Sequence, residues 1–187
     1  MFLQLETDNL ILRKARLEDC NLIWKNVWSD KSIADNMLWE VTKTLEEAQI
    51  RIKKTINYQS TKYAYFVCLK QTNEPIGFAG VYEKDKDIYE ETGICISKRF
   101  QGLGYGKEVV TALKDLVFSK LNGEKFIYGC FSTNNISKKL CLSCGFKYLE
   151  SEPSIREHDK MEYISDYYFF DKEMYVEEQN KIHKFYK

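Results

Sequence analysis

Three glycines within five residues form the part of the sequence that points most clearly to chemistry. They lie in Gln101-Gly102-Leu103-Gly104-Tyr105-Gly106-Lys107, between an apolar run and a segment of helical periodicity. Glycines at alternate positions let the backbone turn tightly and approach a ligand without a Cβ in the way. The first N–H groups of the following helix have no intrahelical partner, and with the helix dipole they attract an anion, usually a phosphate. The segment predicts a phosphate-binding loop; the alternative is a turn that only connects a strand to a helix.

Two familiar kinds of phosphate loop do not fit this segment. A Walker loop has Ser or Thr after its Gly-Lys pair, whereas Glu108 follows Gly106-Lys107 here. A dinucleotide loop has the pattern Gly-x-Gly-x-x-Gly and an acidic residue further on that binds the ribose. Here the third glycine comes one position early, and the next predicted strand ends in Cys130-Phe131-Ser132-Thr133 without an acidic residue. The phosphate therefore belongs to another kind of ligand.

The loop resembles the Gln/Arg-x-x-Gly-x-Gly/Ala loop of the GNAT acetyltransferase superfamily, with Gln101, Gly104 and Gly106 at its fixed positions. The preceding residues 91–96 look like the cofactor-binding strand of that family. Downstream, residues 134–146 are similar to its Asn-x-x-Ser…Gly-Phe helix motif. Because two motifs occur in the right order with a strand between them, the resemblance is more specific than the loop alone.

Residues 5–13 look like the opening of the branch that includes the ribosomal-protein N-terminal (alanine/serine) acetyltransferases. The resemblance covers roughly residues 3–171, and we expect a single N-acetyltransferase domain at 1–171. It implies the GNAT fold, an α/β (α+β) arrangement with a mixed, mostly antiparallel central sheet and helices on both faces. Residues 172–187 form a charged C-terminal tail, for which a helix is one option.

The resemblance implies acetyl-CoA as cosubstrate and direct attack of a primary amine in a ternary complex. The amine is a protein N-terminus or a small molecule. Backbone N–H groups of the loop would hold the pyrophosphate, and the main chain of the cofactor strand would pair with the pantetheine arm. Asn134 would bind the pantetheine, although it could equally be a helix N-cap. The cofactor-binding residues implied are Ile94, Cys95, Ile96, Gln101, Gly102, Leu103, Gly104, Tyr105, Gly106, Lys107, Asn134 and Ser137.

Two residues are candidates for the proton chemistry. Glu91 precedes the cofactor strand and could relay the amine proton through water; the alternative is a solvated charge beside Glu90. Cys141 follows Leu140, where many family members carry Tyr. It could protonate the departing thiolate, it could be a buried small side chain, or solvent could supply the proton. This departure keeps open a second function, a degenerate CoA-binding module with a regulatory or binding role and no turnover.

Metal binding is not expected, although Cys141 and Cys144 form a Cys-x-x-Cys pair. A structural zinc site needs four ligands. The chain has no second such pair, and His158 and His183 lack ligand spacing. We expect the six cysteines to be reduced and mostly buried.

Composition disfavours several kinds of partner, although a local basic patch stays open. The 28 basic and 28 acidic residues cancel, so the surplus of positive charge typical of nucleic-acid binders is missing. No apolar run approaches the roughly 18 residues of a membrane span, and the start lacks the features of a signal peptide. We expect a cytoplasmic protein without membrane or nucleic-acid partners, and a homodimer is left open.

The elements that position these residues are predicted from periodicity and turn signals. Strands are expected on both sides of Asp8-Asn9 and at 63–69, 76–82, 88–96, 126–131, 146–149 and 161–170. Helices are expected within 18–28, from the capping box Thr44–Glu47 to about Tyr58, after the glycine loop, and at 135–144 before Gly145. Strands 63–69, 76–82 and 88–96 should form an antiparallel meander.

Aromatic residues in two regions could border the acceptor amine. In the family the first helices lie beside the acceptor, and the last strand could form the opposite wall. For each residue the alternative is ordinary packing. These residues are Trp24, Trp28, Trp39 and Glu40 in the first region, and Tyr163, Tyr167, Tyr168, Phe169 and Phe170 in the second.

Overall fold

The centre of the molecule is a nine-stranded sheet, which a computed structural model describes within residues 4–185. The strand order is β1-β2-β3-β4-β5-β7-β9-β8, and β6 pairs with β4 beside β5. Only the β5–β7 pair is parallel. The strands are β1 (Leu5–Glu6), β2 (Leu10–Arg13), β3 (Tyr63–Leu69), β4 (Pro75–Asp85), β5 (Ile88–Glu91), β6 (Cys95–Ile96), β7 (Lys125–Phe131), β8 (Lys147–Ile155) and β9 (Glu162–Asp171).

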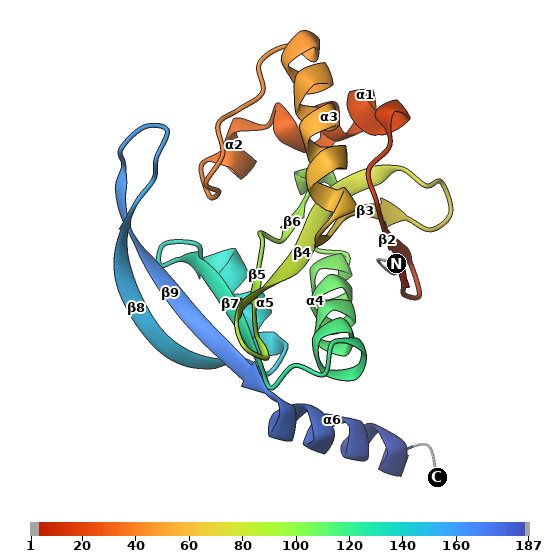
Figure 1. Cartoon of the computed structure of the whole chain (residues 1–187), viewed down its shortest axis with the longest axis vertical. Helices are drawn as coiled ribbons and strands as arrows, with labels where there is room; N and C mark the ends of the chain where they lie inside the picture. The colour runs from red at the N-terminus through yellow and green to blue at the C-terminus, as the bar shows by residue number, and fades with distance from the viewer. Residues whose placement is uncertain (1–3, 186–187) are drawn as a thin grey trace.

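Helices cover both faces of this sheet, which confirms the predicted mixed, mostly antiparallel arrangement (Figure 1). The α-helices are α1 (Cys20–Ile23), α2 (Lys31–Ala34), α3 (Leu45–Ser60), α4 (Tyr105–Asp115), α5 (Asn135–Ser143) and α6 (Lys172–Phe185). Short 3-10 and π segments complete the set: η1 (Leu17–Asp19), η2 (Trp24–Trp28), η3 (Lys98–Phe100) and η4 (Leu116–Lys120).

Side chains alternate along the strands between two hydrophobic cores. On β3, Tyr65 and Val67 point into the core that α4 and α5 cover, whereas Phe66 and Cys68 point into the core under α1 and α3. This is the period of two expected of a strand covered on both faces.

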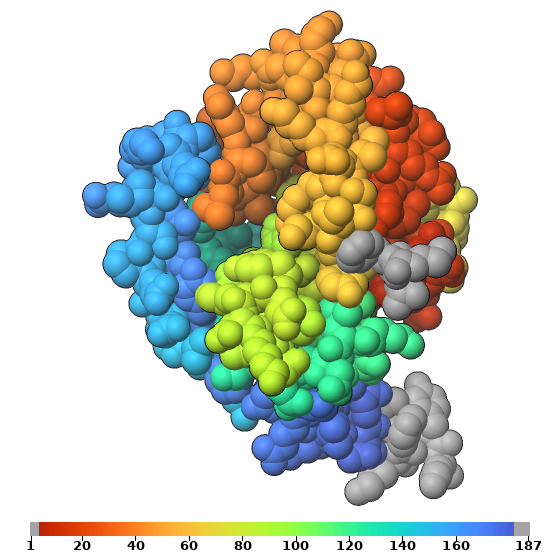
Figure 2. Space-filling model, viewed as in Figure 1, coloured from red at the N-terminus to blue at the C-terminus, as the bar shows by residue number. Residues whose placement is uncertain are grey.

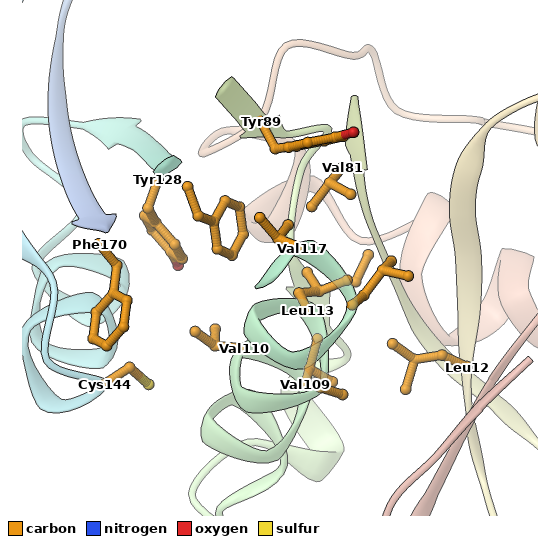
Figure 3. Packing of buried hydrophobic residues seen from close by; sticks show 14 of the residues in the cluster. Leu12, Val81, Tyr89, Val109, Val110, Leu113, Val117, Tyr128, Cys144 and Phe170 are labelled. Carbon is orange, nitrogen blue, oxygen red and sulfur yellow. The ribbon is translucent and has the colours of Figure 1, made fainter. Parts of the chain in front are cut away.

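Helix α4 provides the centre of the larger core. Val109 and Leu113 lie on the helix face directed towards the strands that carry Leu12 and Val81 (Figure 3). All four side chains are completely buried. Their packing fixes α4, and with it the glycine loop at its N-terminus, against the sheet.

The predicted start of α3 is confirmed with one difference. Thr44 is the N-cap, and its hydroxyl accepts a hydrogen bond of 3.2 Å from the backbone N–H of Glu47. The Glu47 carboxylate accepts from the N–H of Lys43 at 2.7 Å, one residue earlier than a capping box requires. The predicted helix within 18–28 is η1, α1 and η2 in succession.

The strands differ from the prediction at three places, the first being β4, which continues to Asp85, three residues beyond the predicted 82. The expected strand at 88–96 is interrupted, so β5 and β6 are separate. Strand β8 continues to Ile155, six residues beyond the predicted 149. The prediction stopped early because β8 is an exposed edge strand, whose sequence lacks the alternation of apolar and polar residues that indicates a strand.

Residues 172–185 of the C-terminal tail form helix α6, which docks through a buried lysine. Lys114 of α4, only 1% exposed, forms an ion pair of 2.6 Å with Glu178 of α6. It also donates to the carbonyl of Cys144 at 3.1 Å and lies 4.2 Å above the ring of Phe170. Helix α6 thus continues from β9 and closes one end of the core (Figure 1).

Glu178→Ala is expected to lower the free energy of unfolding by about 2 kcal/mol, because it leaves the buried Lys114 ammonium without its charged partner. Chemical denaturation measures the change. Glu177→Ala is the matched control, since Glu177 is exposed on the same helix. Equal effects of the two substitutions would show that the ion pair does not hold α6.

Candidate active site

The sheet opens between β6 and β7. Strands β5 and β7 pair over residues 88–90 and 125–127. Beyond this point, within the described chain, β7 pairs only with β9 and β6 only with β4. Backbone N–H and C=O groups of β6 and of residues 128–131 therefore border a slit where two strands would otherwise be joined.

Two glycines make this opening sterically possible. Gly93 has φ of +104° at the point where the chain leaves β5, and its N–H donates to the carboxylate of Glu91. Gly77 lies on β4 directly against β6, where a Cβ would approach the carbonyl oxygen of Cys95 to 2.0 Å. A side chain at Gly77 would thus displace strand β6.

The slit continues into a cavity of about 1130 Å³. The cavity begins at the glycine loop, passes β6 and β7, and ends between residues 32–39 and strand β9. Figure 2 shows the hollow between the orange segment around residues 31–44 and the blue hairpin of β8 and β9. One opening thus connects the predicted phosphate site with Glu91 and the aromatic residues.

The glycine loop has the geometry of an anion site. Gly102 and Gly104 have φ of +79° and +86°, and no described atom lies within 4 Å of the position that a Cβ would take at either. Helix α4 begins at Tyr105 with Gly104 as an N-cap that has no side chain to occupy the first N–H groups. The side chain of Gln101 donates to the carbonyl of Ile96 at 2.8 Å and ties the loop to β6.

Most of the predicted cofactor residues border the same cavity, and the open loop backbone fits a pyrophosphate. Leu103 is 61% exposed, Tyr105 packs on the core, and neither lines the cavity. The predicted residues that line the cavity are Ile94, Cys95, Ile96, Gln101, Gly102, Gly104, Gly106, Lys107, Asn134 and Ser137, together with Glu91.

Asn134 is the N-cap of α5, as one of its two predicted roles requires, and its binding of pantetheine stays a prediction. Its side-chain oxygen accepts from the N–H of Ser137 at 3.1 Å as the N-cap of α5, and the residue also lines the cavity. The hydroxyls of Ser137 and Tyr128 are 2.8 Å apart, which joins α5 to β7 at the cavity wall. Gly145, with φ of +86°, follows the end of α5 as predicted.

Glu91 lies where the slit begins. Its carboxylate faces Gly129 of β7, where a Cβ would be 3.8 Å from Oε1. Burial raises the pKa of Glu91 to about 8, the charge of Glu90 adds to the rise, and the N–H groups of Gly93 and Gly129 lower it. A carboxylate with such a pKa can accept a proton at neutral to alkaline pH.

Cys141 is completely buried in the larger core and does not line the cavity. Burial raises the pKa of its thiol. This geometry favours the packing alternative, and it places the hydroxyls of Tyr128 and Ser137, rather than the thiol, at the cavity wall.

The predicted acceptor residues divide according to strand and helix geometry. Tyr163 and Tyr167 of β9 line the cavity, while Tyr168 and Phe170 alternate with them and point into the core. Trp39 lines the opposite wall. The other predicted residues do not line the cavity. Trp24 and Trp28 pack in the second core, and Glu40 forms an exposed ion pair with Lys43. Phe169 is also absent from the lining.

Residues of β4 and β7 complete the lining, and these were not predicted from the sequence. Gly129 allows the ring of Tyr167 to lie within 3.2 Å of the position of a Cβ. A glycine inside a strand often marks such a close approach, and this was the available signal. Phe78 and Phe131 line the acceptor end of the cavity.

Among the side chains that the structure describes, no three of His, Cys, Asp or Glu are grouped so that they could hold a metal ion. The described helices include none with both the length and the hydropathy needed to cross a bilayer.

Comparison with known proteins agrees with this geometry. The chain is 27% identical to the uncharacterized N-acetyltransferase p20 from Bacillus licheniformis over 172 residues. The matched region covers 89% of this chain and 93% of p20. A GNAT-family acetyltransferase from Bacillus anthracis has a TM-score of 0.80 at 19% identity, covering 91% of this chain and 99% of that one. RimL, a ribosomal L7/L12 alpha-N-protein acetyltransferase in complex with coenzyme A, has a TM-score of 0.76 at 17% identity, covering 92% and 99%.

The family model for the acetyltransferase (GNAT) domain matches residues 9–147, most of the chain. This stretch contains the glycine loop, Glu91 and α5. The protein therefore belongs to the GNAT acetyltransferase family and is an acetyl-CoA-dependent acetyltransferase.

Proposed function

We propose that the protein transfers the acetyl group of acetyl-CoA to a primary amine by direct attack in a ternary complex. The observation that carries this proposal is the continuous cavity, which has a phosphate-binding loop at one end and Glu91 beside an aromatic compartment further along. Both substrates can therefore meet within one site, without an acyl-enzyme.

The donor would lie along β6. Backbone N–H groups at the start of α4 would hold the pyrophosphate, and Lys107, which lines the cavity, adds positive charge there. The main chain of Ile94 and Ile96 would pair with the pantetheine arm as an added strand. The complex of RimL with coenzyme A supports the choice of donor, because that protein shares the fold.

Glu91 would take the proton of the attacking amine, directly or through one water. Its raised pKa of about 8 suits a base that works near neutral pH. Holding the amine and the thioester in one cavity supplies the proximity that the reaction needs.

The departing thiolate would be stabilised by the hydroxyl pair of Tyr128 and Ser137. Burial raises the pKa of Tyr128, so its hydroxyl stays protonated and can hold the Ser137 hydroxyl in a donating orientation. Cys141 has no part in this proposal because it faces the core.

A thiol-release assay with acetyl-CoA and a panel of amines and peptides tests the proposal. We expect release of free CoA that depends on the acceptor, and mass spectrometry should find one added acetyl group on that acceptor. Tight binding of acetyl-CoA without turnover on any acceptor would instead support the CoA-binding module.

A further inference from the structure

Arg156 is a buried arginine near the tip of the β8–β9 hairpin. It is 7% exposed, although its neighbours Glu157 to Lys160 are exposed. Its Nε and Nη2 donate to the carboxylate of Asp159 at 3.0 and 2.5 Å. Its Nη1 lies 3.3 Å from the carbonyl oxygens of both Asp35 and Met37, about 120 residues away in the chain.

These contacts join two segments that form opposite walls of the cavity. Asp35 and Met37 belong to the segment between α2 and α3, and both line the cavity. Strand β9, which follows Arg156, contributes Tyr163, whose ring is 4.3 Å from that of Phe131. We call the link between Arg156 and residues 35–37 the Arg156 bridge. In Figure 2 the blue hairpin meets the orange segment beside the hollow.

The cavity walls that the Arg156 bridge connects are also held in place by the packing of their own side chains. Trp39 follows residues 35–37, and the guanidinium of Arg51 lies 4.4 Å above its ring. Trp39 also contacts Phe78 edge-on, with ring centroids 6.4 Å apart. Stacked aromatic walls of this kind keep their shape when a ligand enters.

The chemistry of this end of the cavity suits a cation with an apolar body. Its lining combines aromatic rings with the carboxylates of Glu90 and Glu91. Aromatic faces attract an ammonium group and bury apolar surface, whereas Glu90 is already paired with Lys84 at 2.6 Å and Glu91, with a pKa of about 8, is mostly uncharged at neutral pH. The rings are those of Trp39, Phe78, Tyr82, Phe131, Tyr163 and Tyr167.

We propose that the Arg156 bridge makes the protein selective for small primary amines with an apolar body, and that Arg156 is the positioning residue that excludes longer acceptors such as peptide N-termini. The proposal rests on the proposed function and names the acceptor class for it. The bridge links the two walls at the acceptor end, so an acceptor must fit between them. A guanidinium is required because its planar fork reaches two carbonyls and a carboxylate at once.

The experiment compares Arg156→Ala, Arg156→Lys and the wild type on phenethylamine and on a hexapeptide with a free N-terminus. In the wild type, kcat/KM for phenethylamine should exceed that for the peptide by at least about tenfold, the order of magnitude that pocket shape provides. Arg156→Ala should raise KM for phenethylamine much more than it lowers kcat, and the preference should fall by about tenfold. Arg156→Lys should retain more of the preference for phenethylamine than Arg156→Ala does.

Arg16→Ala is the matched control, because the Arg16 guanidinium is exposed and forms only a loose ion pair of 3.5 Å with Glu18. It should leave the preference unchanged. Equal use of the peptide and phenethylamine by the wild type, or an unchanged preference in Arg156→Ala, would overturn the proposal.

Binding measurements separate this proposal from the proposed function. Calorimetry of phenethylamine and of the peptide with the CoA-bound protein gives the same comparison without turnover. Selective binding of phenethylamine that is lost in Arg156→Ala supports the bridge even if no acetyl group is transferred, in which case only the proposed function fails. Equal affinities for both ligands would overturn the bridge alone.

Discussion

Gly104→Glu is expected to weaken the binding of acetyl-CoA at least about a hundredfold. The new side chain has space to enter the loop, because no described atom lies within 4 Å of the Cβ position. Its carboxylate would then lie beside the proposed phosphate site. Two like charges about 4 Å apart repel by about 4 kcal/mol near a protein surface, and a hundredfold loss corresponds to about 2.7 kcal/mol. Isothermal titration calorimetry measures the loss.

Gly104→Ala is the control for the effect on the backbone. At φ of +86° both substitutions carry the same strain, about 1 kcal/mol, but alanine brings no charge. Alanine should therefore retain most of the affinity for acetyl-CoA. If the glutamate variant is folded and binds acetyl-CoA like the alanine variant, the loop is not the phosphate site.

Glu91→Gln is expected to lower kcat about a hundredfold or more, the usual contribution of a general base. Affinity for acetyl-CoA should stay nearly unchanged, because the loop is intact. The wild-type rate should rise as pH passes through about 8, where the carboxyl loses its proton, and level off above it. An alkylamine acceptor titrates near 10, so a rise centred near 8 belongs to the protein. The variant should lack it.

Glu90→Gln is the matched control, because Glu90 precedes Glu91 and pairs with Lys84 at 2.6 Å. It should keep the rise in rate, shifted slightly towards lower pH since the neighbouring charge is gone. A wild-type profile that Glu91→Gln leaves in place would remove Glu91 from the proton route.

The same carboxyl should also affect stability, which gives a measurement independent of activity. Its pKa rises on folding from an ordinary 4.5 to about 8, so the folded state binds the proton more tightly. The stability that this proton contributes is present below pH 4.5 and is lost as pH rises through 8. The free energy of unfolding of Glu91→Gln should therefore decline less over this range than that of the wild type.

The sequence allowed local features to be predicted well. The glycine loop and the α5 motif depend on residues close together in the chain, so residue type and spacing were sufficient. The division between β5 and β6 was not predicted, because Gly93 lies within a run that otherwise has the pattern of a strand.

Other features were missed because they depend on partners far along the chain. Arg156 lies in a polar, charged stretch that is typical of a solvated turn. Its burial follows from contacts with residues 35 and 37, for which no local pattern exists. Cys141 stands where a functional tyrosine was expected, and only the packing of α5 shows that its thiol faces the core.

The opening between β6 and β7 leaves the central sheet incomplete at this point. Residues 94–96 and 128–131 border a gap within the sheet, and some of their backbone groups already have side-chain partners, since the carbonyl of Ile96 accepts from Gln101 and the N–H of Gly129 donates to Glu91. Any backbone group at the gap that has no protein partner must bond to water. A donor that pairs with β6 as proposed would occupy this gap as a strand does. Binding of the donor would then also complete the central sheet. The hydrogen bonding between β6 and its neighbour would be continuous only in the donor-bound enzyme.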